Sequence, residues 1–324
     1  MTGGAGFIGS NFVRRVIGGC YPALANAEVV VLDALTYSGN IANLDPVAAS
    51  DRLTFTEGDI ADAALLDELL PGIDSIVHFA AESHVDRSVR DAGPFFATNV
   101  LGTQILYDAA VRAGTPRVVH VSTDEVYGSI ETGSWTEEHI LEPNSPYAAS
   151  KASADLVARA WHRTHGLDVS ITRCSNNYGP YHLPEKLIPL FITNLLEGRH
   201  VPLYGDGENI RDWLHVDDHC DGIALVLSGG RAGEIYNIGG GTELSNRRLT
   251  ELLVAATGRD WSFVDAAPDR IGHDRRYSVD YTKIASELGY RPKVDFEDGL
   301  TAVVEWYREH RAWWEPLLSR SALA

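Results

Sequence analysis

Cysteine is scarce in this sequence of 324 residues, and long apolar runs are missing from it. The cysteines Cys20, Cys174 and Cys220 are scattered, odd in number and form no Cys-X-X-Cys pair. That pattern excludes a disulfide framework or a zinc site of paired cysteines, and it is typical of a reducing compartment. No apolar stretch approaches the roughly 18 residues of a transmembrane helix, and no basic segment leads into an apolar leader. We therefore expect a cytoplasmic protein with no membrane partner.

Positive charge is also in short supply, with 27 lysine and arginine residues against 45 aspartate and glutamate residues and a formal net charge of -18. A surface of this sign repels a phosphate backbone, so we expect no nucleic acid partner. Local basic pockets can still bind a small anionic ligand. The remaining composition, 44% hydrophobic and 22% charged, is that of a globular protein long enough for one large domain or two coupled ones.

The first half of the chain alternates strand-like apolar runs with helix-like segments, a rhythm that predicts a parallel sheet covered by helices on both faces. The predicted strands end at Asp33, Asp59, Ala81, Thr123 and Arg173. Polar groups collect at these carboxyl ends, the edge where open α/β sheets bind ligands. We therefore expect an α/β fold, with a doubly wound parallel Rossmann sheet and a smaller C-terminal α/β substrate-binding lobe.

The two parts are expected to interleave along the chain. We predict a nucleotide-binding Rossmann domain over 1–177, to which a segment near 212–236 returns, and a second lobe built from 178–211 and 237–324. The last helical pattern of this lobe carries Trp306, Trp313 and Trp314, which we expect to be packing residues rather than ligand contacts.

A glycine-rich turn opens the chain. Gly3, Gly4, Gly6 and Gly9 precede an amphipathic helix and match the dinucleotide-binding pattern, in which glycines allow a tight turn and leave the helix amides free to hold a pyrophosphate. Asp33 ends the next predicted strand, where a carboxylate can bond both ribose hydroxyls of an adenosine. Because that carboxylate would repel a ribose phosphate, the pattern favours NAD over NADP.

The same glycine pattern normally follows a central strand, whereas this sequence begins at Met1, directly before Thr2. A sheet that lacked its central strand would be badly destabilised. We therefore expect the true start to lie several residues upstream, with Met1 standing where a strand valine belongs. The intact mass of the protein made from its native locus tests this expectation.

A tyrosine and a lysine lie four residues apart in the segment 142–151. Ser145 and Pro146 have the positions of an N-cap and a first helical residue, so Tyr147 and Lys151 are expected on one face of a helix. We expect the ammonium to favour the phenolate and so to lower the pKa of the tyrosine toward that of a useful base. With a polar strand end at Thr123, the pair predicts a catalytic centre.

Two adjacent carboxylates follow that strand end, at Asp124 and Glu125. Neighbouring acids in a partly desolvated site push their pKa values apart, which permits one acid and one base at neutral pH. The residues alone do not say which of the two is the acid.

Several motifs together carry a resemblance that runs from Thr2 to about residue 300. The motifs are TGGAGFIGS, HFAAESHVDRS, STDEVYG, YAASK, RCSNNYGPYHLPEKLIPL and PLYGDGENIRDWLHVDDHC. They resemble those of the extended short-chain dehydrogenase/reductase family and, within it, of the dTDP-glucose 4,6-dehydratases. The resemblance implies an NAD-dependent hydro-lyase of deoxysugar biosynthesis that forms dTDP-4-keto-6-deoxy-D-glucose and water. It also implies a tightly held NAD, a sugar-nucleotide lobe and a homodimer built through two long helices per subunit.

The resemblance also implies roles for the catalytic residues. Tyr147 would take the 4-hydroxyl proton while NAD takes a hydride from carbon 4, Thr123 would bond the same oxygen, and Lys151 would hold the tyrosine and the nicotinamide ribose. Glu125 would then remove the proton of carbon 5, and Asp124, kept protonated, would protonate the departing 6-hydroxyl. The hydride would return to carbon 6.

Further contacts follow from matching motif positions. The implied cofactor-binding residues are Gly3, Gly6, Phe7, Ile8, Gly9, Asp33, Ala34, Leu35, Thr36, Asp59, Ile60, Ala80, Ala81, Ser83, Thr98, Val121, Ser122, Tyr147, Lys151 and Asn177. The implied residues for binding dTDP-glucose are Ser83, Thr123, Asn176, Glu185, Lys186, Leu187, Pro202, Tyr204, Arg211, Asn246, Arg270, His273 and Tyr277. The histidines show no metal-ligand spacing, and we expect no metal site.

Three alternatives remain in view. A sugar-nucleotide 4-epimerase shares the fold, the cofactor and the Tyr147–Lys151 pair, but it needs no acid and base for the loss of water. A GDP-mannose dehydratase more often calls for NADP, which Asp33 disfavours. A non-catalytic dinucleotide-binding regulator would be expected to have lost Tyr147, Lys151 or the adjacent carboxylates Asp124 and Glu125, all of which are present.

Overall fold

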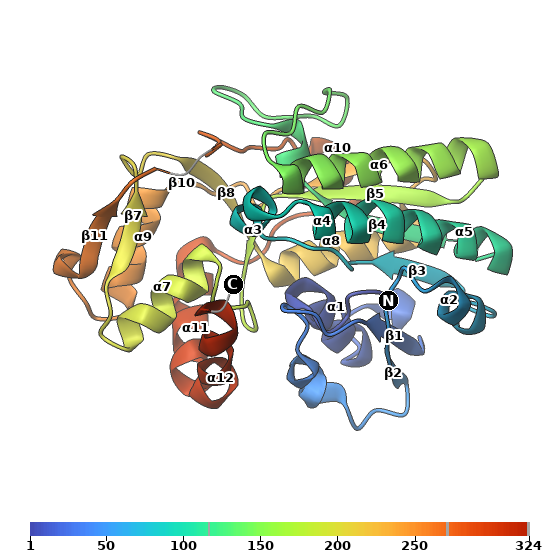
Figure 1. Ribbon diagram of the computed structural model, residues 1–324, viewed down its shortest axis with the longest axis horizontal. Helices are drawn as coiled ribbons and strands as arrows, with labels where there is room; N and C mark the ends of the chain where they lie inside the picture. The colour runs from blue at the N-terminus through green and yellow to red at the C-terminus, as the bar shows by residue number, and fades with distance from the viewer. Residues whose placement is uncertain (116, 270–271, 323–324) are drawn as a thin grey trace.

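A parallel sheet forms the centre of the larger part of the molecule (Figure 1). The computed structural model describes residues 1–115, 117–269 and 272–322. The strands of this sheet are β1 (Val29–Asp33), β2 (Leu53–Glu57), β3 (Ser75–His78), β4 (Arg117–Thr123), β5 (Val169–Cys174) and β9 (Ile235–Ile238). β1 pairs with β2, and the others follow the order β3-β4-β5-β9. Every one of these pairings is parallel, which confirms the predicted fold class.

Thr2 joins the two runs of strands into one surface. It forms parallel bridges to Leu32 of β1 and to His78 of β3, and so occupies the position between them. The terminal amino nitrogen of Met1 donates to the carbonyl of Val30 at 2.6 Å, and burial lowers the pKa of this amino group to about 5. The sheet order is therefore β2-β1-Thr2-β3-β4-β5-β9.

The predicted strands are all present, but some of their ends were wrong. β2 ends at Glu57 rather than Asp59, and β3 ends at His78 rather than Ala81. On the side of β3 that faces β1, Thr2 is the only residue that forms a bridge, and it does so with His78. The next backbone contact on this side is the Phe79 N–H, which donates to the Thr2 carbonyl at 3.0 Å. Because the end of a strand depends on where its neighbouring strand ends, the apolar runs alone predicted β2 and β3 to be too long.

Helices cover both faces of the sheet. The helices concerned are α1 (Phe7–Ile17), α2 (Ala63–Leu69), α5 (Thr103–Ala113), α6 (Pro146–His165), α8 (Val216–Gly229) and α10 (Thr282–Leu288). α1, α8 and α10 share a core with one sheet face, built from side chains such as Phe12, Val119 and Ile223. α2, α5 and α6 share the opposite core, with Leu66, Leu106 and others. The result is a doubly wound arrangement.

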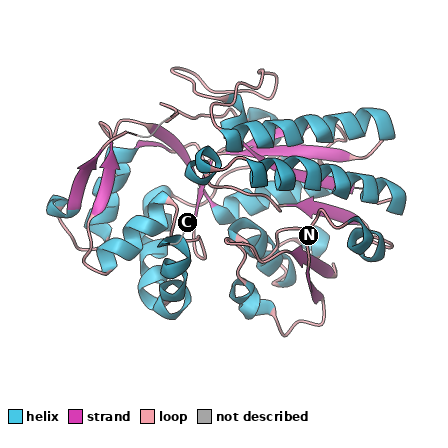
Figure 2. Cartoon of the chain, viewed as in Figure 1, coloured by secondary structure: helices cyan, strands magenta, loops and turns pink. Residues whose placement is uncertain are grey.

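A smaller lobe lies at the other end of the molecule, with short strands and its own helices (Figure 2). Its elements are β6 (Asn176–Tyr178), α7 (Leu187–Leu196), β7 (Val201–Tyr204), β8 (Ile210–His215), β10 (Glu243–Ser245), α9 (Asn246–Ala256), β11 (Val264–Ala267), α11 (Phe296–Glu309) and α12 (Arg311–Ala322). The strand orders are β10-β8-β6 and β11-β7. A separate core holds this lobe, with Ile192, Leu253, Val303 and Trp314 fully buried or nearly so.

The chain crosses between the two parts more than once. After β8 it enters α8, which packs on β4 and β5, and β9 then pairs with β5 at the edge of the large sheet. Among the described residues, no helix is both long and apolar enough to cross a membrane.

Candidate active site

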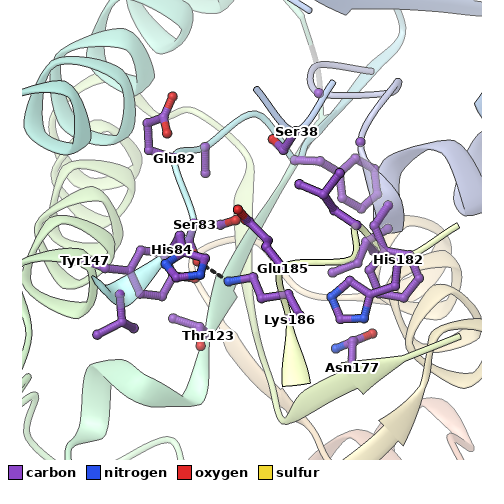
Figure 3. Close-up of a pocket in the computed structure, with 18 of the residues that line it drawn as sticks. Ser38, Glu82, Ser83, His84, Thr123, Tyr147, Asn177, His182, Glu185 and Lys186 are labelled. Atoms are coloured by element: carbon purple, nitrogen blue, oxygen red, sulfur yellow. Dashed lines mark hydrogen bonds between the residues drawn. The ribbon is translucent and has the colours of Figure 1, made fainter. Parts of the chain in front are cut away.

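A cavity of about 440 Å³ lies at the carboxyl ends of the large sheet, between it and the smaller lobe. Residues that follow β1, β3, β4 and β5 line one side, and residues from the segment before α7 and from β8 line the other. Figure 3 shows Thr123, Tyr147, Asn177 and Lys186 converging on this space from different elements. The cavity is therefore at the sheet edge where a ligand was predicted.

The glycine turn forms the floor of one end of the cavity. Gly3 has φ +68°, and a Cβ there would lie 2.5 Å from the backbone nitrogen of Ala80. A Cβ on Gly9 would lie 2.2 Å from the carbonyl oxygen of Gly3. Gly6 precedes the first turn of α1 and has no side chain to cap it, so the amides of that turn are open to the cavity. The backbone thus fits a pyrophosphate at a helix N-terminus.

Asp33 lies at the end of β1 and is 8% exposed. Its carboxylate accepts the N–H of Ala5 at 2.8 Å and the N–H of Leu35 at 2.9 Å. Burial raises the pKa of Asp33, and these two hydrogen bonds oppose the rise. A carboxylate has further lone pairs, which remain for ribose hydroxyls. Leu35, with φ 48°, thus orients Asp33 and does not line the cavity itself.

Helix α6 carries Tyr147 and Lys151 into the cavity. Ser145 caps it as predicted, because its hydroxyl accepts the N–H of Ala148 at 3.1 Å, and Pro146 is the first helical residue. The Lys151 ammonium donates to the carbonyl of Val121 at 2.7 Å, which ties the helix to β4. Both side chains are buried.

The predicted lowering of the pKa of Tyr147 was wrong when only the side chains of the protein are considered. Burial raises the pKa of Tyr147 well above its ordinary value, the Glu125 charge raises it further, and a hydrogen bond with Thr123 opposes the rise. Burial also lowers the pKa of Lys151. Desolvation therefore outweighs the attraction that the sequence suggested. A phenolate at this position needs a further positive charge in the cavity.

Asp124 follows β4 and is 2% exposed. The Thr123 hydroxyl donates to its Oδ1 at 3.3 Å, whereas Oδ2 has no hydrogen-bond partner among the described residues. Burial raises the pKa of Asp124 well above its ordinary value, and the charges of Glu125 and Asp212 raise it further. Asp124 is therefore shifted toward its neutral form, and its Oδ2 has no hydrogen-bond partner among the described residues and can meet a ligand in the cavity.

Glu125 lies next to Asp124 in a different electrostatic environment. Burial raises its pKa, but the cations of Lys186 and Arg211 oppose the rise. Its backbone N–H donates to the Thr123 hydroxyl at 3.3 Å, which fixes the turn that presents both acids. The pKa values of both neighbours are therefore raised, and that of Asp124 is raised well above its ordinary value, which makes Asp124 the better proton donor of the two.

The cavity brings most of the predicted binding residues together. From the cofactor set it is lined by Gly3, Gly6, Phe7, Ile8, Gly9, Asp33, Ala34, Thr36, Asp59, Ile60, Ala80, Ala81, Ser83, Thr98, Val121, Ser122, Tyr147, Lys151 and Asn177. From the substrate set it is lined by Ser83, Thr123, Asn176, Glu185, Lys186, Leu187, Tyr204, Arg211, Asn246, His273 and Tyr277. Pro202 does not line it, because this residue lies within the β7–β11 ladder opposite Asp265. Arg270 lies outside the described residues.

Other lining residues were missed by the sequence. His182 stacks on Phe7 with ring centroids 4.1 Å apart, beside the glycine turn. Trp313, which was expected only to pack, lines the cavity and donates through Nε1 to Asn43 Oδ1 at 2.9 Å. His182 had a usable signal, since it lies inside the quoted motif between Asn177 and Glu185. The sequence carries no such signal for Trp313, because its place in the cavity depends on where α12 packs.

Over the part of the chain that the structure describes, no cluster of three or more histidine, cysteine, aspartate or glutamate side chains is arranged to hold a metal ion. The cavity presents the acids Asp124 and Glu125, the phenol of Tyr147 and the cations Lys151, Lys186 and Arg211.

Comparison with known proteins gives this site a family. The family model described as GDP-mannose 4,6 dehydratase matches residues 1–303. A dTDP-glucose 4,6-dehydratase of Streptomyces niveus is 60% identical over 319 residues, which cover 98% of this chain and 95% of the relative. One of Streptomyces antibioticus is 59% identical over 323 residues, covering 99% and 96%.

A solved structure agrees over nearly the whole length. The crystal structure of DesIV, a dTDP-glucose 4,6-dehydratase from Streptomyces venezuelae with NAD and TYD bound, is 68% identical and superposes with a TM-score of 0.97, covering 98% of each chain. The family model carries the name of a GDP-mannose enzyme, but the close relatives carry the dTDP-glucose name over their full length. The chain therefore belongs to the dTDP-glucose 4,6-dehydratases, within the family whose model is described as GDP-mannose 4,6 dehydratase.

Proposed function

We propose that this protein converts dTDP-glucose to dTDP-4-keto-6-deoxy-D-glucose and water. The observation that carries the proposal is the placement of Asp124 and Glu125, directly after Thr123, in the same cavity as Tyr147 and Lys151. An epimerase needs only the tyrosine and lysine, whereas loss of water needs an acid and a base as well. The two carboxylates are therefore the part of the site that the proposed reaction requires and epimerisation does not.

NAD fits the end of the cavity formed by the glycine turn and Asp33. A Cβ at Gly3 or Gly9 would collide with neighbouring backbone, so only glycine allows the tight turn that precedes the open amides at the start of α1. Asp33 would hold the adenosine ribose, and its charge disfavours a ribose phosphate. A bound NAD would accept a hydride from carbon 4 of the glucose and return it to carbon 6, and its nicotinamide would add positive charge to the cavity.

The first proton transfer falls to Tyr147. Its phenolic oxygen would take the proton of the 4-hydroxyl, with the Thr123 hydroxyl bonded to the same oxygen. Lys151, whose ammonium donates to the Val121 carbonyl at 2.7 Å, would supply positive charge for this step. Because burial opposes the phenolate, this cation and the nicotinamide are both needed for the step.

The adjacent carboxylates then divide the elimination between them. The ketone at carbon 4 acidifies the proton of carbon 5, and Glu125 would remove it, since the charges of Lys186 and Arg211 oppose the rise in its pKa that burial causes. Asp124, whose pKa is raised by burial and by its acidic neighbours, would give a proton to the departing 6-hydroxyl. The environments of the two residues thus support the order, acid at Asp124 and base at Glu125, that the residue types left open.

A mass experiment tests the function. The purified protein is incubated separately with dTDP-glucose, UDP-glucose and GDP-mannose, and the nucleotide sugars are analysed by mass spectrometry. We expect dTDP-glucose to lose the mass of one water with no net formation of NADH. A product of unchanged mass would indicate epimerisation, and faster dehydration of GDP-mannose or UDP-glucose would reject the assignment of the thymidine nucleotide.

We also propose a homodimer that forms through α5 and α6. These two helices pack against each other on one face of the large sheet (Figure 1). Their outer side and the preceding π-helical segment, Ala97–Gly102, carry exposed apolar side chains: Leu101 is 53% exposed and Leu156 is 56% exposed. An apolar helix pair is costly to leave in water and is suited to pair with its own copy.

The proposed location is the cytoplasm. All three cysteines are free thiols, and Cys20 is exposed, which fits a reducing compartment. Fractionation of the native organism, with the protein followed by antibody, tests this proposal.

A further inference from the structure

The mouth of the cavity is bridged by direct contacts between the two lobes. The segment that follows β3 reaches across to the segment that precedes α7. Lys186 donates from Nζ to the carbonyl of Ser83 at 2.7 Å, the contact drawn as a dashed line in Figure 3. Arg87 donates from Nη2 to Oε2 of Glu185 at 2.9 Å. Both Glu185 and Lys186 line the cavity, so these bridges lie at its wall and not on a remote surface.

Arg87 has the more specific environment of the two bridging cations. Its guanidinium lies 3.8 Å from the ring centroid of Tyr37 while it bonds Glu185. The side chain of Arg87 is 22% exposed and that of Glu185 is 8% exposed, so the pair is largely shielded from water. A planar guanidinium can stack and bond a carboxylate at once, whereas a lysine ammonium lacks the stacking plane. Arg87 thus fixes the direction of a carboxylate that faces the sugar end of the cavity.

The segment that carries Arg87 is anchored to the catalytic helix. Ser88, 1% exposed, accepts the backbone N–H of Tyr147 at 3.1 Å. Asn99, also 1% exposed, accepts the N–H of Glu82 at 2.8 Å and donates to the Ser150 hydroxyl at 2.8 Å. A movement of the segment away from Glu185 would therefore pull directly on the first turns of α6.

We propose that Arg87 is a positioning residue that keeps the cavity mouth closed, through Glu185, between removal and return of the hydride. This inference rests on the proposed function. After the first step the sugar has given a hydride to NAD and a proton to Tyr147, and it is a 4-ketone. If that ketone leaves, the enzyme keeps NADH and the turnover is aborted. A clamp between the lobes is of direct use to an enzyme whose cofactor must be restored by the same sugar molecule.

Loss of the clamp is expected to change the fate of the intermediate rather than only the rate. We compare Arg87→Met and Arg87→Lys with Arg112→Met, a matched loss of an arginine from the exposed pair with Asp67, where both side chains are about half exposed. The holoenzyme is mixed with excess dTDP-glucose, and NADH absorbance and free nucleotide sugars are followed together. The quantity compared is the number of turnovers completed for each enzyme molecule that becomes trapped with NADH. We expect this number to be at least tenfold lower in Arg87→Met than in wild type, and we expect released dTDP-4-keto-glucose to be detected by mass. Arg87→Lys should lie between the two.

Two results would overturn the role of Arg87. One is an unchanged number of turnovers per trapped enzyme in Arg87→Met, even if kcat falls. The other is an equal change in Arg112→Met. The NAD content and melting temperature of each variant are measured first; if Arg87→Met is unfolded, Tyr37→Leu, which removes the ring under the guanidinium, takes its place with the same criteria. A wild-type protein that releases no water from dTDP-glucose would instead refute the proposed function.

Discussion

Arg173 donates from Nε to Oδ2 of Asp155 at 2.8 Å, and both side chains are almost fully buried between β5 and α6. His120 of β4 lies on the other carboxylate oxygen, with Nε2 and Oδ1 3.4 Å apart. Asp155 is one helical turn beyond Lys151, so this charged cluster lies behind the catalytic pair on the same helix. The buried ion pair of Asp155 and Arg173 thus packs beside the catalytic helix, on the side away from the cavity.

Removal of that carboxylate should be costly to stability. Asp155→Asn leaves the Arg173 guanidinium buried without its counter-charge, and we expect the free energy of unfolding at pH 7 to fall by about 3–5 kcal/mol. Urea titration followed by circular dichroism measures it. Asp67→Asn breaks an exposed ion pair and serves as the control, with an expected change of about 0–1 kcal/mol. Equal losses in the two variants would contradict the importance of burial.

The stability that Asp155 contributes should depend on pH. Arg173 and His120 outweigh the effect of burial and lower the pKa of Asp155 from 3.8 to about 2. A depressed pKa contributes stability that is present above the unfolded value and lost as the pH falls through the folded value. We expect about 2 kcal/mol of the difference between wild type and Asp155→Asn to disappear between about pH 4 and pH 2. A difference that stays constant over that window would show that the charge of Asp155 plays no part.

Variants of the adjacent carboxylates should separate acid from base. Glu125→Gln and Asp124→Asn should both still form bound NADH with dTDP-glucose, and both should lose water about 10²–10⁴ times more slowly. In heavy water, Asp124→Asn should still exchange the carbon 5 proton because Glu125 is intact, whereas Glu125→Gln should not. The exchange is read by mass spectrometry of the recovered sugar. The opposite pattern of exchange would reverse the two roles.

Asp33 should set the choice of cofactor. Asp33→Asn keeps an acceptor for the Ala5 amide but removes the charge that bonds the ribose and repels a ribose phosphate. A hydrogen bond to a charged group is worth about 1.5–3 kcal/mol, so we expect NAD to bind roughly 10 to 100 times more weakly. The preference for NAD over NADP should narrow at the same time. Fluorescence titration of the cofactor-free protein measures the affinities for NAD and NADP. An unchanged preference for NAD would show that Asp33 does not determine the choice of cofactor.

Much of the site was predictable because its signals are local. Thr123, Asp124 and Glu125 follow an apolar run, and parallel strands bring their carboxyl ends to one edge, so the sequence itself places them near the glycine turn. The cap at Ser145 is likewise a signal within a few residues. Features that depend on distant partners were not predictable. Arg87 and Glu185 are 98 positions apart, and no local pattern pairs them.

The error on Tyr147 has the same origin. Its spacing from Lys151 was read correctly from the helix period, but its pKa depends on burial and on Glu125, which approaches from another element. Spacing along one helix reports neighbours on that helix only. The desolvation of a side chain is a property of the whole fold, so the sign of the pKa shift required the structure.

The proposed dimer face gives the final prediction. Leu156 of α6 and Leu101 of the segment before α5 are the exposed apolar side chains that would meet a second copy. Ile140, 70% exposed in the 124–145 connection, is an apolar residue elsewhere on the surface. Leu101→Glu with Leu156→Glu places four charges in a two-fold interface, which should give a monomer in size-exclusion chromatography with light scattering. Ile140→Glu should leave the mass unchanged. A dimer that survives the double change would place the interface elsewhere, and a wild-type monomer would refute the dimer itself.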